Sequence, residues 1–196
     1  FEFTREFMNF EPEAWSLRWY RQMVGISSIG DTTVVTDKWM LGTRNSFIIG
    51  ICATFLATAL GTVAALGLSR PNMPFKGTIM AILISPMIVP LIITSAGMFF
   101  FYSKIGLTHT YLGLILAHTA LGTPFVVITV TATLTGFDTN LIRASQSLGA
   151  DTMRTFFKVI MPLILPGVIS GALFAFITSF DEVVVVMFVG SVEQIT

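Results

Sequence analysis

Four long apolar segments constrain this chain more than any other feature of its sequence. They cover residues 45–69, 77–103, 110–134 and 166–190. The first three contain no Asp, Glu, Lys or Arg, and the fourth contains only the adjacent pair Asp181 and Glu182. About 20 helical residues, rising 1.5 Å each, cross the ~30 Å hydrocarbon core of a bilayer. The sequence therefore predicts an all-α, multi-pass membrane protein that crosses the bilayer four times.

Composition agrees with this interpretation and excludes several classes of function. Charged residues make up 11% of the chain, against about 25% in soluble domains. The formal net charge is zero, which gives no reason to expect nucleic acid as a partner. The single cysteine, Cys52, excludes an intrachain disulfide, and His109 and His118 lack companions at metal-ligand spacing. We therefore expect a lipid bilayer around the chain, and neither a metal site nor catalytic residues.

Two of the apolar segments carry small residues at every fourth position. In the first segment they are Ala53, Ala57, Gly61 and Ala65. In the fourth they are Gly167, Gly171, Ala175 and Ser179. Such stripes let a second helix approach closely inside a membrane. The second segment differs, since Pro86 and Pro90 should bend it.

The charges of the connecting segments predict the orientation. Residues 70–76 carry two cations and no acid, and residues 135–165 contain Arg143, Arg154 and Lys158. By contrast, residues 104–109 carry only Lys104. The positive-inside rule places the two more basic segments in the cytoplasm. Residues 1–44 are then an extracytoplasmic segment, and residues 1–196 form a single transmembrane domain.

The 135–165 loop carries the start and stop signals of two short helices. Gly149 suits the left-handed position after a helix, and Asp151 can cap the helix that follows. We expect Pro162 to stop that helix and Pro166 to lie in the first turn of the last span. The result would be a compact helical projection joined to a membrane helix. The alternative is an ordinary loop between spans.

The acidic pair in the fourth segment also has two interpretations. A continuous helix would place Asp181 within roughly 5 Å of the membrane midplane, where a charge costs about 2.5–3.5 kcal/mol. In the first interpretation Asp181, together with Glu182, lines a translocation path for a cation, with Phe180 available for a cation–π contact. In the second, both acids are solvated at the outer end of the helix.

Several motifs resemble the permease subunits of binding-protein-dependent ABC importers. In that family a cytoplasmic loop carries Glu-Ala-Ala, then Gly, then Ile-x-Leu-Pro at fixed spacing. The matching positions here are Arg143-Ala144-Ser145, Gly149 and Val159-Ile160-Met161-Pro162. The segments WSLRWY, NSFIIG, SPMIVP, LILAHTALGTPFVV and GALFAFITSFDEVVV follow the order of the spermidine/putrescine type. The departures are Arg143, where Glu is usual, and Ser145, where Ala is usual.

The resemblance implies a type I ABC importer permease-like helical bundle with a coupling helix in its cytoplasmic loop. It also implies one further span before residue 1 and another after residue 196. The residues that would contact the ATPase are Arg143, Ala144, Ser145, Leu148, Gly149, Ala150, Asp151, Phe156 and Pro162. No G-x-x-x-x-G-K-[ST] motif is present, so ATP-Mg would bind a partner ATPase and this chain would be no enzyme.

The implied partners are ATP-binding subunits, a second homologous permease and an extracytoplasmic solute-binding protein. The implied location is the bacterial inner membrane, and the implied solute is a polyamine or a similar small cation. The alternative is an ion-coupled secondary transporter or channel. It would use Asp181 and Glu182, with His118, as its ion site; His118 could instead be a helix-packing residue.

Overall fold

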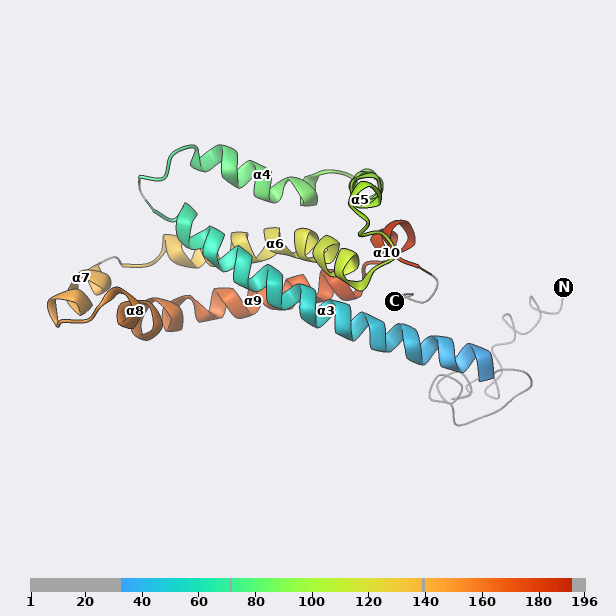
Figure 1. Ribbon diagram of the computed structural model, residues 1–196. Coiled ribbons are helices and arrows are strands. Elements are labelled where there is room, and N and C mark those ends of the chain that lie inside the picture. Colours follow the sequence, from blue (N-terminus) through green and yellow to red (C-terminus); the bar gives the residue numbers. More distant parts are fainter. Residues whose placement is uncertain (1–32, 71, 139, 192–196) are drawn as a thin grey trace, which may run out of the picture. The chain divides into compact units, whose positions relative to one another are not determined.

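The computed structural model describes residues 33–191, apart from 71 and 139, and all the regular structure in this part of the chain is helical (Figure 1). The chain divides into two units, residues 1–44 and 45–196. In the first unit, the described residues 33–44 are helical and belong to α3, Thr33–Leu68. The helix therefore begins well before residue 45, where the sequence predicts the start of the first span. Residues 1–32 of the expected extracytoplasmic segment lie outside the described residues.

The second unit continues α3 and adds helices of very different lengths. These are α4 (Lys76–Ile88), α5 (Leu91–Ile105), α6 (Tyr111–Thr135), α7 (Asn140–Ser147), α8 (Thr152–Thr155), the π-helix η2 (Phe156–Ile160), α9 (Met161–Phe180) and α10 (Val184–Val189). Within the described residues, three helical stretches are long and apolar enough to cross a membrane: Met40–Leu68, Tyr111–Thr135 and Thr152–Phe180. The pair α4 and α5, bent by 104° at its break, makes a fourth if it is one span.

Helices α6 and α9 pack side by side and run antiparallel. His118 of α6 bonds Ser179 of α9. Further along α6, Val126 lies against Gly171, where an added Cβ would come within 2.8 Å of the Val126 Cα. All four small residues predicted to form a stripe on α9 are buried. The prediction of a close-packing stripe on this span is confirmed.

Helices α3 and α6 run parallel. Tyr111, at the start of α6, donates a hydrogen bond from its hydroxyl to the Asn45 side-chain oxygen at 3.1 Å. Gly61 follows Asn45 by sixteen residues, and Val126 follows Tyr111 by fifteen. A Cβ on Gly61 would lie 2.7 Å from the Cβ of Val126, so the two helices stay adjacent in the same direction. The predicted small-residue stripe of α3 is thus also a close-packing surface, with Ala53, Ala57 and Ala65 almost fully buried.

This parallel arrangement determines whether the bent pair α4–α5 crosses the membrane. Two spans that run in the same direction begin on the same side of the membrane. The chain between Leu68 and Tyr111 must therefore cross back, so α4 and α5 form one broken span and not a re-entrant loop. The break follows the prolines, because Pro86 lies inside α4 and Pro90 caps α5. The predicted bend is confirmed, and the four-span zigzag is retained.

The fourth predicted span, 166–190, is wrong at both ends. Helix α9 ends at Phe180, and α10 is a separate six-residue helix. At the other end, α8, η2 and α9 follow one another without a break, so Pro162 does not stop the helix. The π-turn explains this, because Met161 donates its N–H to Phe156, five residues back. Pro162 then falls at the start of α9, where a missing N–H is tolerated.

Candidate functional site

The 135–165 loop folds as a helical projection that extends beyond the ends of α6 and α9 (Figure 1). Gly149 ends α7 with φ +83°, as predicted. Its N–H donates to the Gln146 carbonyl at 2.9 Å, and the Ala150 N–H donates to the Ser145 carbonyl at 3.1 Å. This pair of bonds is the Schellman pattern, in which the carbonyls of the last helical turn are satisfied. The corner between α7 and α8 is therefore defined by the backbone.

Asp151 caps α8, as the sequence predicts. Its side chain accepts a hydrogen bond from the Arg154 N–H at 2.7 Å. Such caps contribute about 1 kcal/mol.

We expect Asp151→Ala to lower the stability of the loop by about 1 kcal/mol, because the freed N–H of the first turn loses its partner. Asp151→Asn is the matched control, since its amide oxygen can still accept that bond. Amide hydrogen exchange in residues 151–156 measures the effect on the full-length protein. Equal exchange rates in the two variants would contradict the capping role.

A second contact, between two side chains, ties α7 to α8. The hydroxyls of Ser145 and Thr155 lie 2.9 Å apart, and Thr155 is buried. In the sequence, Ser145 stands out only as a departure from the usual Ala, and Thr155 does not stand out at all. No local pattern points to this pair, because the nine residues between them follow neither helical nor strand periodicity.

The predicted coupling residues do not all lie together. Arg143, Ala144, Leu148 and Asp151 are exposed, and Leu148, with 89% of its surface accessible, lies beside the Gly149 corner. Met153 of α8 is a further exposed apolar residue, at 66%. Of the others, Ser145, Ala150 and Phe156 are half-buried, Gly149 is exposed, and Pro162 lies at the start of α9.

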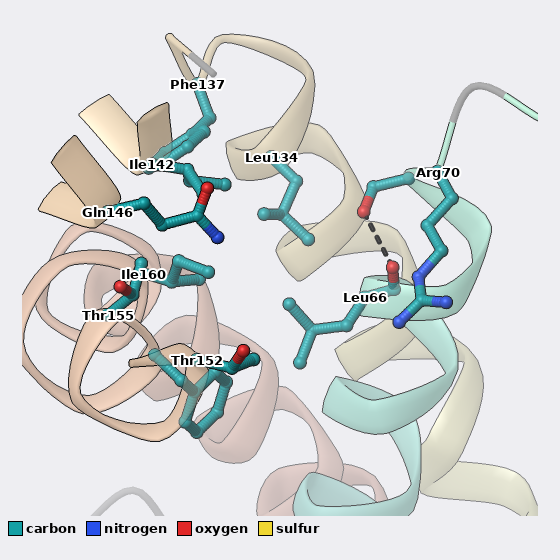
Figure 2. A pocket seen from close by; sticks show the side chains of 11 residues that line it. Leu66, Arg70, Leu134, Phe137, Ile142, Gln146, Thr152, Thr155 and Ile160 are labelled. Atoms are coloured by element: carbon teal, nitrogen blue, oxygen red, sulfur yellow. Dashed lines mark hydrogen bonds between the residues drawn. The ribbon is translucent and has the colours of Figure 1, made fainter. Parts of the chain in front are cut away.

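A cavity of about 370 Å³ separates this projection from the ends of two spans (Figure 2). Its wall on one side is formed by the last turn of α3 and the end of α6. On the other side it is formed by α7, α8 and η2. Figure 2 shows Leu66, Leu134 and Ile160 around its interior.

The acidic pair lies at the opposite end of α9, and its two members have different environments. Asp181 ends α9 and is exposed. Glu182 is buried, and its Oε1 accepts a hydrogen bond from the Val185 N–H at 2.9 Å. Glu182 therefore satisfies a free backbone donor in the first turn of α10.

The position of Asp181 along the bundle follows from its neighbours on α6. Because Ser179 lies opposite His118, Asp181 is level with about position 116 of α6. The middle of α6 is position 123, so Asp181 is about 10 Å away, toward the α6 N-terminus. The expectation of roughly 5 Å rests on a continuous helix to Gly190, which the break after Phe180 rules out.

Phe180 belongs to an aromatic cluster beside Asp181. Its ring centroid lies 5.3 Å from that of Phe47 and 5.6 Å from that of Phe176. Phe180 and Phe47 are partly exposed, at 43% and 47%. The end of α9 thus combines an exposed carboxylate with accessible aromatic rings.

We expect Glu182→Ala to destabilise the protein by about 1–3 kcal/mol, since it leaves the buried Val185 N–H without an acceptor. Glu182→Gln keeps an acceptor oxygen and should lose far less. The midpoint of thermal unfolding in detergent compares the two variants of the full-length protein. If the Gln variant is as unstable as the Ala variant, the carboxylate charge matters and the capping account fails.

One ring nitrogen of His118 contributes to helix packing. Its Nδ1 lies 2.7 Å from the Ser179 hydroxyl, which links α6 to α9. Its Nε2 is buried without a hydrogen-bond partner in the part of the chain that the structure describes. Five threonines of α6 bond back to carbonyls of their own helix: Thr119, Thr123, Thr129, Thr133 and Thr135.

These features define a polytopic helical membrane protein with a structured loop before its last long span. Residues 57–195 match the family described as binding-protein-dependent transport system inner membrane component. The chain belongs to this family, whose members are transport components and not enzymes. This assignment does not favour the ion-coupled alternative.

Several curated proteins are similar to the chain over most of its length. One is the spermidine/putrescine transport system permease protein PotC of Haemophilus influenzae, 29% identical over 97% of this chain and 70% of the relative. A second is the putrescine transport system permease protein PotI of Escherichia coli K12, 30% identical over 89% of this chain and 61% of the relative. PotC of Escherichia coli K12 is 29% identical over 78% and 58%. The resemblance to polyamine-type permeases is confirmed, and the chain spans between 58% and 70% of these relatives.

Proposed function

We propose that the chain is the permease subunit of an ATP-driven importer for a polyamine or a similar small cation. The observation that carries this proposal is the capped projection, which continues into α9 without a break. A loop that only connected two spans would need no Schellman corner, capped helix or cross-link between α7 and α8. The names of the relatives support the choice of solute.

The projection is the coupling element in this proposal. Leu148 and Met153 expose apolar surface beside the Gly149 corner, which suits insertion into a groove of an ATPase. Movement of the ATPase would pass to α9 through α8 and η2, which leave no flexible joint. The partner ATPase would bind ATP-Mg, and the projection of this chain would transmit its movement to the spans.

The distribution of basic residues supports a cytoplasmic position for the projection. Five cations lie at the end of the second unit where α3 and α6 terminate: Arg70, Lys76, Arg143, Arg154 and Lys158. By the positive-inside rule this end faces the cytoplasm, in the bacterial inner membrane. A solute-binding protein would dock at the opposite end, and a second homologous permease would complete the path.

Asp181 is the residue that we assign to the translocation path. The C-terminal end of α9 carries partial negative charge, which adds to the Asp181 carboxylate in attracting a cation. Phe180 and its aromatic neighbours supply rings for cation–π contact. Glu182 is excluded from direct solute contact in this proposal, because its carboxylate is buried and engaged by Val185.

We expect Asp181→Asn to lower putrescine uptake about tenfold, since a hydrogen bond to a charged group contributes about 1.5–3 kcal/mol. The side chain keeps its size, so the amount of protein in the membrane should not change. Uptake of radiolabelled putrescine by intact cells measures the effect, with immunoblotting as the control for protein amount. Unchanged uptake would remove Asp181 from the path.

Co-purification tests the subunit role directly. The tagged full-length protein, extracted in mild detergent, should carry with it an ATPase and a second permease, identified by mass spectrometry. Recovery of the chain alone, or as a homo-oligomer without an ATPase, would contradict the proposal. That result would favour an ion-coupled transporter.

A further inference from the structure

The cavity under the projection has the features of a binding site for an amphiphile. Its volume of about 370 Å³ falls within the range of small-molecule sites, about 300–1,000 Å³. Six apolar side chains form most of the wall: Leu66, Leu134, Phe137, Ile142, Phe156 and Ile160. The polar lining residues are Ser69, Arg70, Gln146, Thr152 and Thr155.

Two of the polar residues are already engaged by the protein, and three are not. The Ser69 hydroxyl donates to the Leu66 carbonyl at 2.9 Å, and Thr155 is bonded to Ser145. By contrast, within the described residues no hydrogen bond or ion pair involves the side chains of the other three. These are Arg70, Gln146 and Thr152. All three can donate hydrogen bonds, so the rim of the cavity offers unused donors and one full positive charge.

The position of the cavity along the spans places it at the level of lipid headgroups. Helix α6 has 25 residues, about 37 Å, which exceeds the ~30 Å hydrocarbon core. Its last residues therefore reach the interfacial layer, where Leu134 and Phe137 line the cavity. Arg70 follows the end of the parallel helix α3, and Figure 2 shows its guanidinium at the rim beside Leu66.

We propose that this cavity binds an anionic phospholipid. The phosphate contacts Arg70, with Gln146 and Thr152 as further donors, and the upper part of an acyl chain lies against the apolar wall. A soluble anion would leave six apolar side chains in contact with water. An uncharged apolar ligand would leave the Arg70 charge at the rim without a partner. Basic pockets between membrane helices on the cytoplasmic side recognise lipid headgroups in this way.

A bound lipid would also support the projection mechanically. The cavity lies between α7–α8 and the ends of α3 and α6, so the ligand fills space that the protein leaves open. Removal of the lipid should therefore loosen the projection relative to the spans. This inference rests on the membrane location of α3 and α6 and on the cytoplasmic orientation proposed above, and it holds whatever solute is transported.

Lipid retention by the full-length protein tests the proposal. The protein is placed in nanodiscs made of equal parts phosphatidylglycerol and phosphatidylcholine, released, and analysed by native mass spectrometry. We expect it to retain one phosphatidylglycerol in preference to phosphatidylcholine. Arg70→Gln should reduce this retention about fivefold, as expected for one basic contact at a membrane surface. Lys104→Gln is the matched control, because it removes the same charge from the last turn of α5, away from the cavity, and should not change lipid retention.

A second variant tests the cavity without changing charge. Gln146 is exposed, and its replacement by Trp fills the cavity from the α7 side; it should lower retention as Arg70→Gln does. Equal retention by all variants, or no preference for phosphatidylglycerol, would overturn the proposal. Displacement of the lipid by millimolar inorganic phosphate would indicate a site for a soluble anion instead. If Gln146→Cys cross-links to another segment of the full-length chain and no phospholipid is retained, protein fills the cavity.

Discussion

Replacement of Gly171 by valine is expected to prevent α6 and α9 from packing and to give little folded protein. A Cβ at this position would lie 2.8 Å from the Val126 Cα, which is backbone and cannot rotate away. The two helices would have to separate along the stripe that runs from Gly167 to Ser179. Overpacking of a core costs about 1–3 kcal/mol, and a clash with backbone belongs at the upper end of that range.

The matched control for this substitution is Gly97→Val in α5. A Cβ on Gly97 would meet nothing within 4 Å, so the same change in helix propensity occurs without a clash. The midpoint of thermal unfolding in detergent should fall sharply for Gly171→Val and little for Gly97→Val. Similar midpoints for both variants would show that α6 and α9 do not pack through this stripe.

Replacement of Gly149 by valine should have the second large effect, on coupling and not on the spans. The cause is conformational, because nothing lies within 4 Å of a Cβ there and φ is +83°. A left-handed conformation costs an L-residue about 1–2 kcal/mol, and a β-branched side chain is the least suited to it. The Schellman corner should therefore open, and α7 should lose its fixed angle to α8.

Gly149→Asn separates this cause from side-chain size, since Asn tolerates the left-handed region. We expect Gly149→Val to lose at least about fivefold in co-purified ATPase, because 1 kcal/mol corresponds to about this factor, whereas Gly149→Asn should retain most of it. The thermal midpoint of the spans should be close to wild type in both. If the Val variant binds the ATPase normally, the corner is not part of the coupling element.

Sequence patterns predict the parts of the fold that depend on uniform helices. The small-residue stripes on α3 and α9 specify close packing by themselves, and both face α6 in the structure. The structure of the loop is equally predictable, because Gly149 and Asp151 act within their own turns. Each of these features rests on local chemistry that a reader of the sequence can follow.

The breaks are harder to predict because they depend on competition between neighbouring groups. Asp181 and Glu182 look like charges within a span, but the Glu182 side chain takes the N–H of Val185 and starts a new helix. Pro162 looks like a helix stop, but the π-turn from Phe156 to Ile160 lets the helix continue although Pro162 has no N–H to donate. The cavity cannot be predicted at all, since it forms where α3, α6 and the projection come together.

Transport in a defined system tests the central claim most directly. The full-length protein, co-purified with its ATPase and second permease, is reconstituted into liposomes with the solute-binding protein and radiolabelled putrescine on its side of the membrane. We predict putrescine accumulation that requires both ATP on the ATPase side and the binding protein, and that ionophores do not abolish. Accumulation without ATP, driven by a proton or sodium gradient and lost with ionophore, would contradict the account.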